Sequence, residues 1–295
     1  MTRLGIGTTW RSRAIALLLV VGCDDPTRPE ALDVPTFVFV SSDEGAPALY
    51  RFEAGTITRL SAPGTDDRDP HSAAGRIVFT SRRDGNAEIY AADLGLAGQL
   101  RLTNGTATDD APALDPTGTT VAFVSSRSGT PRVWLMDVTG ANPRPLETGS
   151  ATFVPEGSPA WSPTGDRLAF TSTRTNASQV FVVVAAGGSA IQLSHEATGA
   201  FTPAWSADGG SIAYVILSGG PGVMRVPASG GGDATPFALD DGGISDPACR
   251  GSICLAVTGA LDAAGDLIAI SASGRTRRSI LARAADDRQP AILVP

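Results

Sequence analysis

Residues able to do chemistry are few in this 295-residue sequence, which contains two histidines, three cysteines and no lysine. Metal sites usually draw on histidine, and only His71 and His195 exist. The lack of lysine excludes Schiff-base chemistry and lysine-dependent phosphate loops. The Gly-x-Ser-x-Gly pattern of hydrolase nucleophiles is also absent. We therefore assign no catalytic residue and no metal site, and whether the protein has any catalytic activity stays open.

Cys249 and Cys254 lie close together near the end of the chain. Their spacing predicts that they face each other on the two strands of one hairpin. An even pair of cysteines in an oxidising compartment favours a disulfide, with two buried thiols as the alternative. Because the closed loop would be short, its entropic stabilisation would be small.

Cys23 follows a segment with the features of a secretion signal. Arg3, Arg11 and Arg13 precede an apolar stretch at 14–21 that is too short to span a membrane. The sequence VVGC at 20–23 resembles a bacterial lipobox, in which the cysteine is lipidated; an ordinary signal peptide with an incidental cysteine is the alternative. We expect a signal peptide over 1–22, a lipid-anchored tether over 23–35 and an extracytoplasmic lipoprotein, on the periplasmic side or in the outer membrane.

The composition favours many short strands and an acidic surface. The chain has 34 glycines and 21 prolines, which are typical of strands joined by turns. Its net charge is −7, and phosphate binding needs clustered positive charge. We therefore expect no nucleic-acid partner, and contact with a membrane only through the lipid anchor.

A repeat runs through the rest of the chain. Segments such as SPAWSPTGDRLAF from Ser158 and TPAWSADGGSIAY from Thr202 recur with a period near 44 residues. The equivalent prolines are Pro70, Pro112, Pro159, Pro203 and Pro247. Such a period, with four strands per unit, is typical of a β-propeller. A solenoid is the alternative, but it would need end caps, and the sequence shows none.

Each repeat divides into four short strands, called A to D in chain order. Strand A holds the proline, a turn with glycine follows, and strand B is an apolar run such as VAFVSS from Val121. Such apolar runs indicate burial on both faces.

The two ends of the repeat array complement each other. The first unit begins at Thr36 with strand B, whereas the chain ends with a lone strand A around Pro290, which falls on the period. We predict that this last strand completes the first blade. Residues 36–295 would then form one all-β, six-bladed propeller with four-stranded blades.

Two of the repeats resemble those of the TolB β-propeller family: FTSRRDGNAEIYAAD from Phe79 and PAWSPTGDRLAFTSTR from Pro159. The resemblance covers nearly all of 36–295 and is specific for this propeller class rather than for a function. It implies the propeller part without the N-terminal α/β domain that TolB carries. Family members bind periplasmic proteins or gate serine peptidases, and the family includes polyuronate lyases whose metal site uses several histidines.

Charged residues gather between the strands. Acids precede the proline of strand A and arginines follow strand B, and both kinds of connection, D–A and B–C, lie on one face of a propeller. We expect an acidic ring around the channel there, or else ion pairs between blades that fix the loops. The candidate binding-face residues are Asp67, Asp69, Arg83, Asp109, Asp110, Arg127, Glu156, Arg174, Asp246 and Asp287.

These observations predict a lipid-anchored, monomeric binding or scaffold module of the cell envelope. Its expected partner is an envelope protein or a basic peptide segment. No cofactor is expected, although a divalent cation at the channel mouth stays open. The alternative is a glycan- or polyuronate-binding protein or lyase that uses the channel mouth. Trp161 and Trp205 in strand A would then form a stacking platform instead of packing between blades.

Overall fold

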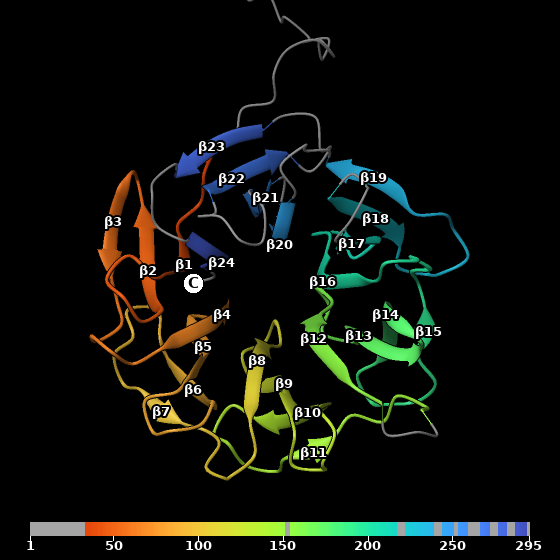
Figure 1. Ribbon diagram of the computed structural model, residues 1–295, viewed down its shortest axis with the longest axis horizontal. Helices are drawn as coiled ribbons and strands as arrows, with labels where there is room; N and C mark the ends of the chain where they lie inside the picture. Colours follow the sequence, from red (N-terminus) through yellow and green to blue (C-terminus); the bar gives the residue numbers. More distant parts are fainter. Residues whose placement is uncertain are drawn as a thin grey trace, which may run out of the picture. The chain divides into compact units, whose positions relative to one another are not determined.

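The computed structural model describes residues 33–150, 154–216, 222–238, 244–250, 253–258, 266–271, 277–281 and 287–293. Within these ranges the chain forms six four-stranded antiparallel sheets and no helix. Figure 1 shows the sheets arranged as blades around a centre, with strands β4, β8, β12, β16, β20 and β24 innermost. The predicted six-bladed propeller is confirmed. The predicted signal peptide, Cys23 and most of the tether lie outside the described residues.

The strands follow the repeat in the order A, B, C, D. Blade one contains β24 (Asp287–Ile292), β1 (Phe37–Ser41), β2 (Ala48–Glu53) and β3 (Thr56–Arg59). Blade two contains β4 (Asp67–Ala73), β5 (Arg76–Ser81), β6 (Glu88–Asp93) and β7 (Leu100–Arg101). Blade three contains β8 (Asp109–Leu114), β9 (Thr120–Ser125), β10 (Arg132–Asp137) and β11 (Arg144–Pro145).

The second half of the ring repeats the pattern. Blade four contains β12 (Glu156–Trp161), β13 (Arg167–Thr175), β14 (Ala177–Val184) and β15 (Ile191–Gln192). Blade five contains β16 (Ala200–Trp205), β17 (Ser211–Ile216), β18 (Val223–Pro227) and β19 (Thr235–Ala238). Blade six contains β20 (Ile244–Arg250), β21 (Ile253–Thr258), β22 (Asp266–Ser271) and β23 (Arg277–Leu281).

The ring is closed by the last strand of the chain, as the sequence predicted. In β24, Ile292 lies opposite Phe37 of β1, and Asp287 lies opposite Ser41. Leu293 N–H also donates to the carbonyl oxygen of Thr36 at 3.0 Å. Both described ends of the ring therefore meet at the end of the propeller that carries the A–B turns.

The core consists of apolar clusters between neighbouring blades. Because side chains alternate along a strand, each B strand supplies residues to both of its seams. In β1, for example, Phe37 and Phe39 pack toward blade six, whereas Val38 and Val40 pack toward blade two. The same arrangement recurs at all six seams. Each blade therefore depends on two neighbours, and the ring gains its stability by closing.

The innermost strands share a bulge directly before their proline. The register of strand A against strand B shifts there in every blade. The residue before the proline has a φ near +50° in five blades: Asp69, Ala111, Ser158, Thr202 and Gln289. Backbone of this kind is costly for residues other than glycine.

Candidate functional site

Blades two, three and four carry the same arginine–acid pair at the D–A and B–C end. The arginine follows strand B, and the acid begins strand A of the same blade. In blade three, Arg127 Nη2 donates to Asp109 Oδ2 at 2.8 Å, and Arg127 Nε donates to Ser125 Oγ at 2.7 Å. The guanidinium lies over the rings of Phe123 and Trp134, with centroids 5.2 and 4.9 Å away. The equivalent pairs are Arg83–Asp67 at 3.0 Å and Arg174–Glu156 at 2.9 Å.

The acids of these pairs are buried. Asp67 is 0%, Asp109 2% and Glu156 3% exposed. They therefore do not form the exposed acidic ring that we expected from the sequence. They instead form ion pairs that fix the loops, which was the alternative expectation. Each pair joins two segments of the same blade, however, and not two neighbouring blades. Their effect is to hold the B–C loops in place on strand A.

Two further carboxylates, Asp69 and Asp110, remain partly exposed on the inner strands of blades two and three. The Asp69 N–H donates to Gln289 Oε1 at 3.0 Å, and Gln289 Nε2 donates back to the Asp69 carboxylate. Burial raises the pKa of the Asp69 carboxyl. Burial, followed by the nearby charge of Asp69, raises the pKa of Asp110 to about 6.

These two acids are the part of the expected ring that remains available to a ligand. Asp69 is satisfied by an amide, whereas no hydrogen bond or ion pair of the described residues holds the Asp110 carboxylate. The charge of Arg82 acts on Asp110 in the opposite direction and lowers its pKa. The rim therefore carries charge of both signs.

The remaining candidates of this face differ between blades. Blade five begins strand A with Ala200, so the arginine–acid pair is missing there. The side chains of Asp246 and Asp287 lie outside the described residues. The repeated pair is thus a feature of blades two to four, where the sequence repeat is also strongest.

The other end of the channel contains a cavity that the sequence did not reveal. It has a volume of about 600 Å³ and lies among the A–B turns and the strand A prolines. None of the described residues that line it carries a charged side chain. Its wall residues include Leu114, Trp161, Trp205, Ile292 and His71. The short A–B turns give no sign of it in the sequence, because the hollow arises only where strands of separate blades meet.

Trp161 and Trp205 pack between blades and also reach the cavity wall. The Trp161 Nε1–H donates to the Ala113 carbonyl of blade three at 3.0 Å, and the Trp205 Nε1–H donates to the Ala160 carbonyl of blade four at 3.0 Å. Each indole therefore links one strand A to that of the preceding blade. The inter-blade packing expected for them is present, and their rings remain part of the cavity lining.

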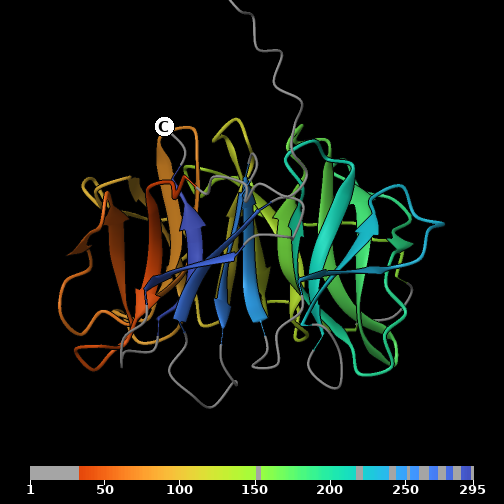
Figure 2. The same cartoon turned by 90° about the horizontal axis from the view of Figure 1, so that it is seen from above.

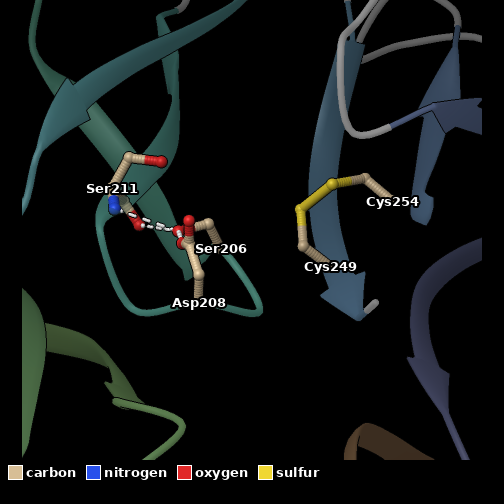
Figure 3. The surroundings of a disulfide bond; sticks show 5 residues. All are labelled: Ser206, Asp208, Ser211, Cys249 and Cys254. Atoms are coloured by element: carbon tan, nitrogen blue, oxygen red, sulfur yellow. Dashed lines mark hydrogen bonds between the residues drawn. A yellow bond between two sulfur atoms is a disulfide. The ribbon is translucent and has the colours of Figure 1, made fainter. Parts of the chain in front are cut away.

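Cys249 and Cys254 are joined by a disulfide on the wall of the same cavity. They lie opposite each other in β20 and β21, with an S–S distance of 2.02 Å. Figure 3 shows the bridge beside the A–B turn of blade five, where Ser206 Oγ donates to Asp208 Oδ1 at 2.6 Å. Cys249 lines the cavity, and Cys254 is buried.

The histidines occupy unlike places. His71 lies in β4 on the cavity wall, whereas His195 is exposed after β15. Among the described residues, no group of three or more His, Cys, Asp or Glu side chains could hold a metal ion. The same residues contain no helix with the length and hydropathy needed to cross a membrane.

The fold defines a class: a six-bladed β-propeller with four-stranded antiparallel blades that is closed by its last strand. No family model matches the chain. A 67-residue segment is 39% identical to the protein TolB homolog of Chlorobaculum tepidum, but it covers 22% of this chain and 15% of that protein.

Solved structures of TolB proteins show the same architecture. The structure matches TolB from Acinetobacter baumannii with a TM-score of 0.72 and 21% identity, over 88% of this chain and 67% of that one. It matches a putative TolB from Agrobacterium tumefaciens with a TM-score of 0.68 and 15% identity, over 85% and 90%. At such identities the likeness establishes the fold and leaves the function to be argued from this chain's own residues.

Proposed function

We propose that the protein is a lipid-anchored binding module of the cell envelope, and that it captures a basic segment of a partner protein at the D–A and B–C end. The observation that carries this proposal is the position of Asp69 and Asp110, two partly exposed acids on a rim of loops held by buried ion pairs. With a pKa of about 6, Asp110 carries negative charge there at neutral pH. Preorganised loops lower the entropy cost of docking, and the charge speeds encounter with a cationic segment.

The position of the chain ends supports the choice of this surface. Residues 33–36 lead into β1 at the A–B end, and Leu293 leaves β24 beside them. The D–A and B–C end is therefore the end farther from the point where residue 33 enters the ring. Figure 2 shows the ring of blades from the side.

Binding at this surface can be tested with an arginine-rich peptide as the probe. We expect the double variant Asp69→Asn/Asp110→Asn to associate more slowly and with a weaker dependence on salt. The matched control is Asp166→Asn/Asp208→Asn, which removes two acids from the A–B turns of blades four and five. The proposal fails if the two double variants change the association rate equally, or if neither changes it.

Lipid anchoring is tested separately. We expect Cys23→Ser to move the protein from the membrane fraction to the soluble extracytoplasmic fraction of cells. If the variant partitions into membranes as strongly as the wild type, Cys23 is not the anchor.

A further inference from the structure

The cavity at the A–B end differs in chemistry from the rim at the other end of the channel. Among the described residues its wall contains prolines, alanines, two indoles, Leu114 and Ile292, and no charged side chain. It also contains three serines whose hydroxyls are hydrogen-bonded within the protein: Ser72, Ser162 and Ser206. Its volume of about 600 Å³ lies within the range of small-molecule sites, roughly 300–1,000 Å³. A charged ligand entering it would lose hydration without meeting an opposite charge, which is costly. The cavity therefore suits an uncharged, largely apolar molecule.

One residue of the cavity wall breaks the symmetry of the ring. The position after the strand A proline is alanine in five blades, Ala113, Ala160, Ala204, Ala248 and Ala291. In blade two the same position holds His71. Because alanine fills this position in the other five blades, strand A does not need a larger side chain there. The imidazole of His71 is therefore a feature of blade two alone.

The hydrogen bonding of His71 fixes what it presents. Its Nδ1 accepts from the Leu114 N–H of blade three at 3.1 Å, so the proton of the neutral ring lies on Nε2. Burial lowers the pKa of His71 to about 4, which keeps the ring neutral at physiological pH. No hydrogen bond among the described residues uses the Nε2–H. His71 thus holds one neutral donor at the cavity wall.

The seam between blades two and three explains why this donor is there. Where blades four and five use a tryptophan to bond the preceding blade, blade three has Leu114 at that position. The link between blades two and three takes its side chain from the earlier blade instead, because the backbone N–H of Leu114 in blade three donates to His71 Nδ1 in blade two. One nitrogen of His71 therefore has a structural role, and the other is left for a ligand.

We propose that the A–B cavity is a binding site for a compact, uncharged, mainly apolar or aromatic molecule with an acceptor oxygen, which receives the hydrogen bond of His71 Nε2. The indoles of Trp161 and Trp205 supply apolar contact area. The site is separate from the surface proposed for the protein partner, and its test involves neither Asp69 nor Asp110.

The first measurement uses the neutral fluorophore N-phenyl-1-naphthylamine. We expect saturable binding with energy transfer from tryptophan. Benzophenone carries one carbonyl acceptor, whereas diphenylmethane has nearly the same shape without it. A hydrogen bond contributes roughly 0.5–1.5 kcal/mol net, so benzophenone should displace the probe about 2- to 10-fold more effectively. The anionic 4-benzoylbenzoate should compete more weakly than benzophenone.

The variant His71→Ala installs the alanine of the other five blades and should abolish the preference for benzophenone over diphenylmethane. His195→Ala, at the exposed histidine, is the matched control and should keep that preference. Thermal melting of both variants shows whether the ring is intact. If His71→Ala does not fold, Ala160→Leu serves instead, because it narrows the cavity with His71 in place and should weaken both ligands.

Photo-crosslinking by the bound benzophenone locates the site. We expect adducts in peptides that contain strand A residues of the cavity wall. The proposal is overturned if the fluorophore does not bind saturably, if the carbonyl preference survives in His71→Ala, if Ala160→Leu binds like the wild type, or if adducts form on the outer strands near Leu100 and Ile191.

Discussion

Arg127 shows how one side chain can fasten a loop to a blade. Its guanidinium bonds the carboxylate of Asp109 and the hydroxyl of Ser125, and it lies on two aromatic rings. The side chain of Asp109 is 2% exposed, whereas that of Arg127 is 27% exposed. The Asp109 carboxylate is almost completely shielded from water. It therefore loses more than Arg127 does when the ion pair is broken.

Breaking this pair should destabilise the ring. We expect Arg127→Met to lower the free energy of unfolding by about 3 kcal/mol, because Asp109 is left buried and unpaired. Denaturant unfolding followed by circular dichroism would measure it. Arg144→Met, at an exposed arginine of the same blade, is the control and should cost less than about 0.5 kcal/mol. Equal losses in the two variants would show that Arg127 has no special role.

Asp110 should make stability depend on pH. Its pKa is raised to about 6 in the folded protein from an ordinary value near 3.8, mainly by burial. The folded state therefore binds its proton more tightly than the unfolded state, and the destabilisation by this group grows as pH rises from about 4 through 6. Asp110→Asn should raise the melting temperature at pH 7.5 and change it little at pH 4.

The exposed Glu147 of the same blade provides the control. Glu147→Gln removes an equal charge and should show no such difference between pH 4 and pH 7.5. If Asp110→Asn lowers the melting temperature at pH 7.5, then the carboxylate is stabilised by its surroundings and our account of it is wrong.

Sequence patterns located these charged residues but did not show which of them face solvent. The spacing of Arg83, Arg127 and Arg174 after strand B correctly indicated a shared repeat position. It could not show that each guanidinium turns back onto strand A of its own blade, because that depends on the serine and aromatic rings beside it. The partial exposure of Asp69 and Asp110 could likewise not be predicted from the repeat pattern.

At the scale of the element, the bulge in strand A is the main departure from a regular strand. The division of each repeat into four strands, the A–B turns and the apolar inner strands were predictable, because each repeat shows the same turn residues and apolar runs. The bulge was not, since the residue types at its centre are as different as Asp69, Ala111 and Thr202. What the five positions share is the proline that follows each of them, and not the residue type at the centre of the bulge.

The bulge predicts a stabilising substitution. Ala111 has a φ of +48°. A residue other than glycine loses roughly 1–2 kcal/mol of folding free energy in this conformation. Glycine avoids that strain, but its more flexible unfolded chain costs about 0.5–1 kcal/mol. Ala111→Gly should therefore raise the free energy of unfolding, by up to about 1 kcal/mol. Ala113→Gly, two residues later in β8 at a buried site of ordinary backbone, should lower it. A loss in both variants would mean that the positive φ is not a strained conformation here.

For the whole molecule, closure of the ring is the property on which every other feature depends. The six seams are alike, so an open ring would expose two apolar blade faces at once. Closure was predictable from the sequence because the missing strand A of the first unit and the extra one at the end fall on the same period. The cavity was not, because it is formed by side chains of strands from separate repeats, and no single repeat encodes it.

Two altered chains should separate the need for closure from the order of the strands. Deleting residues 287–295 removes β24, leaves one edge of β1 unpaired and exposes the cluster around Phe37, so we expect a fall of several degrees in melting temperature and aggregation. A circular permutant joins residue 293 to residue 36 by a short linker and opens the chain between Thr117 and Gly118. The joined ends already share the hydrogen bond from Leu293 N to Thr36 O, so the linker needs little span.

In the permutant, β8 becomes the last strand and pairs with β9 near the new start, so blade three takes over the closing role. All six seams are kept, and we expect a monomer with a melting temperature within a few degrees of the wild type. Size-exclusion chromatography and thermal melting would measure both properties. A stable truncated chain would show that β24 is dispensable. An unstable permutant would show instead that blade three cannot take over the closing role of blade one.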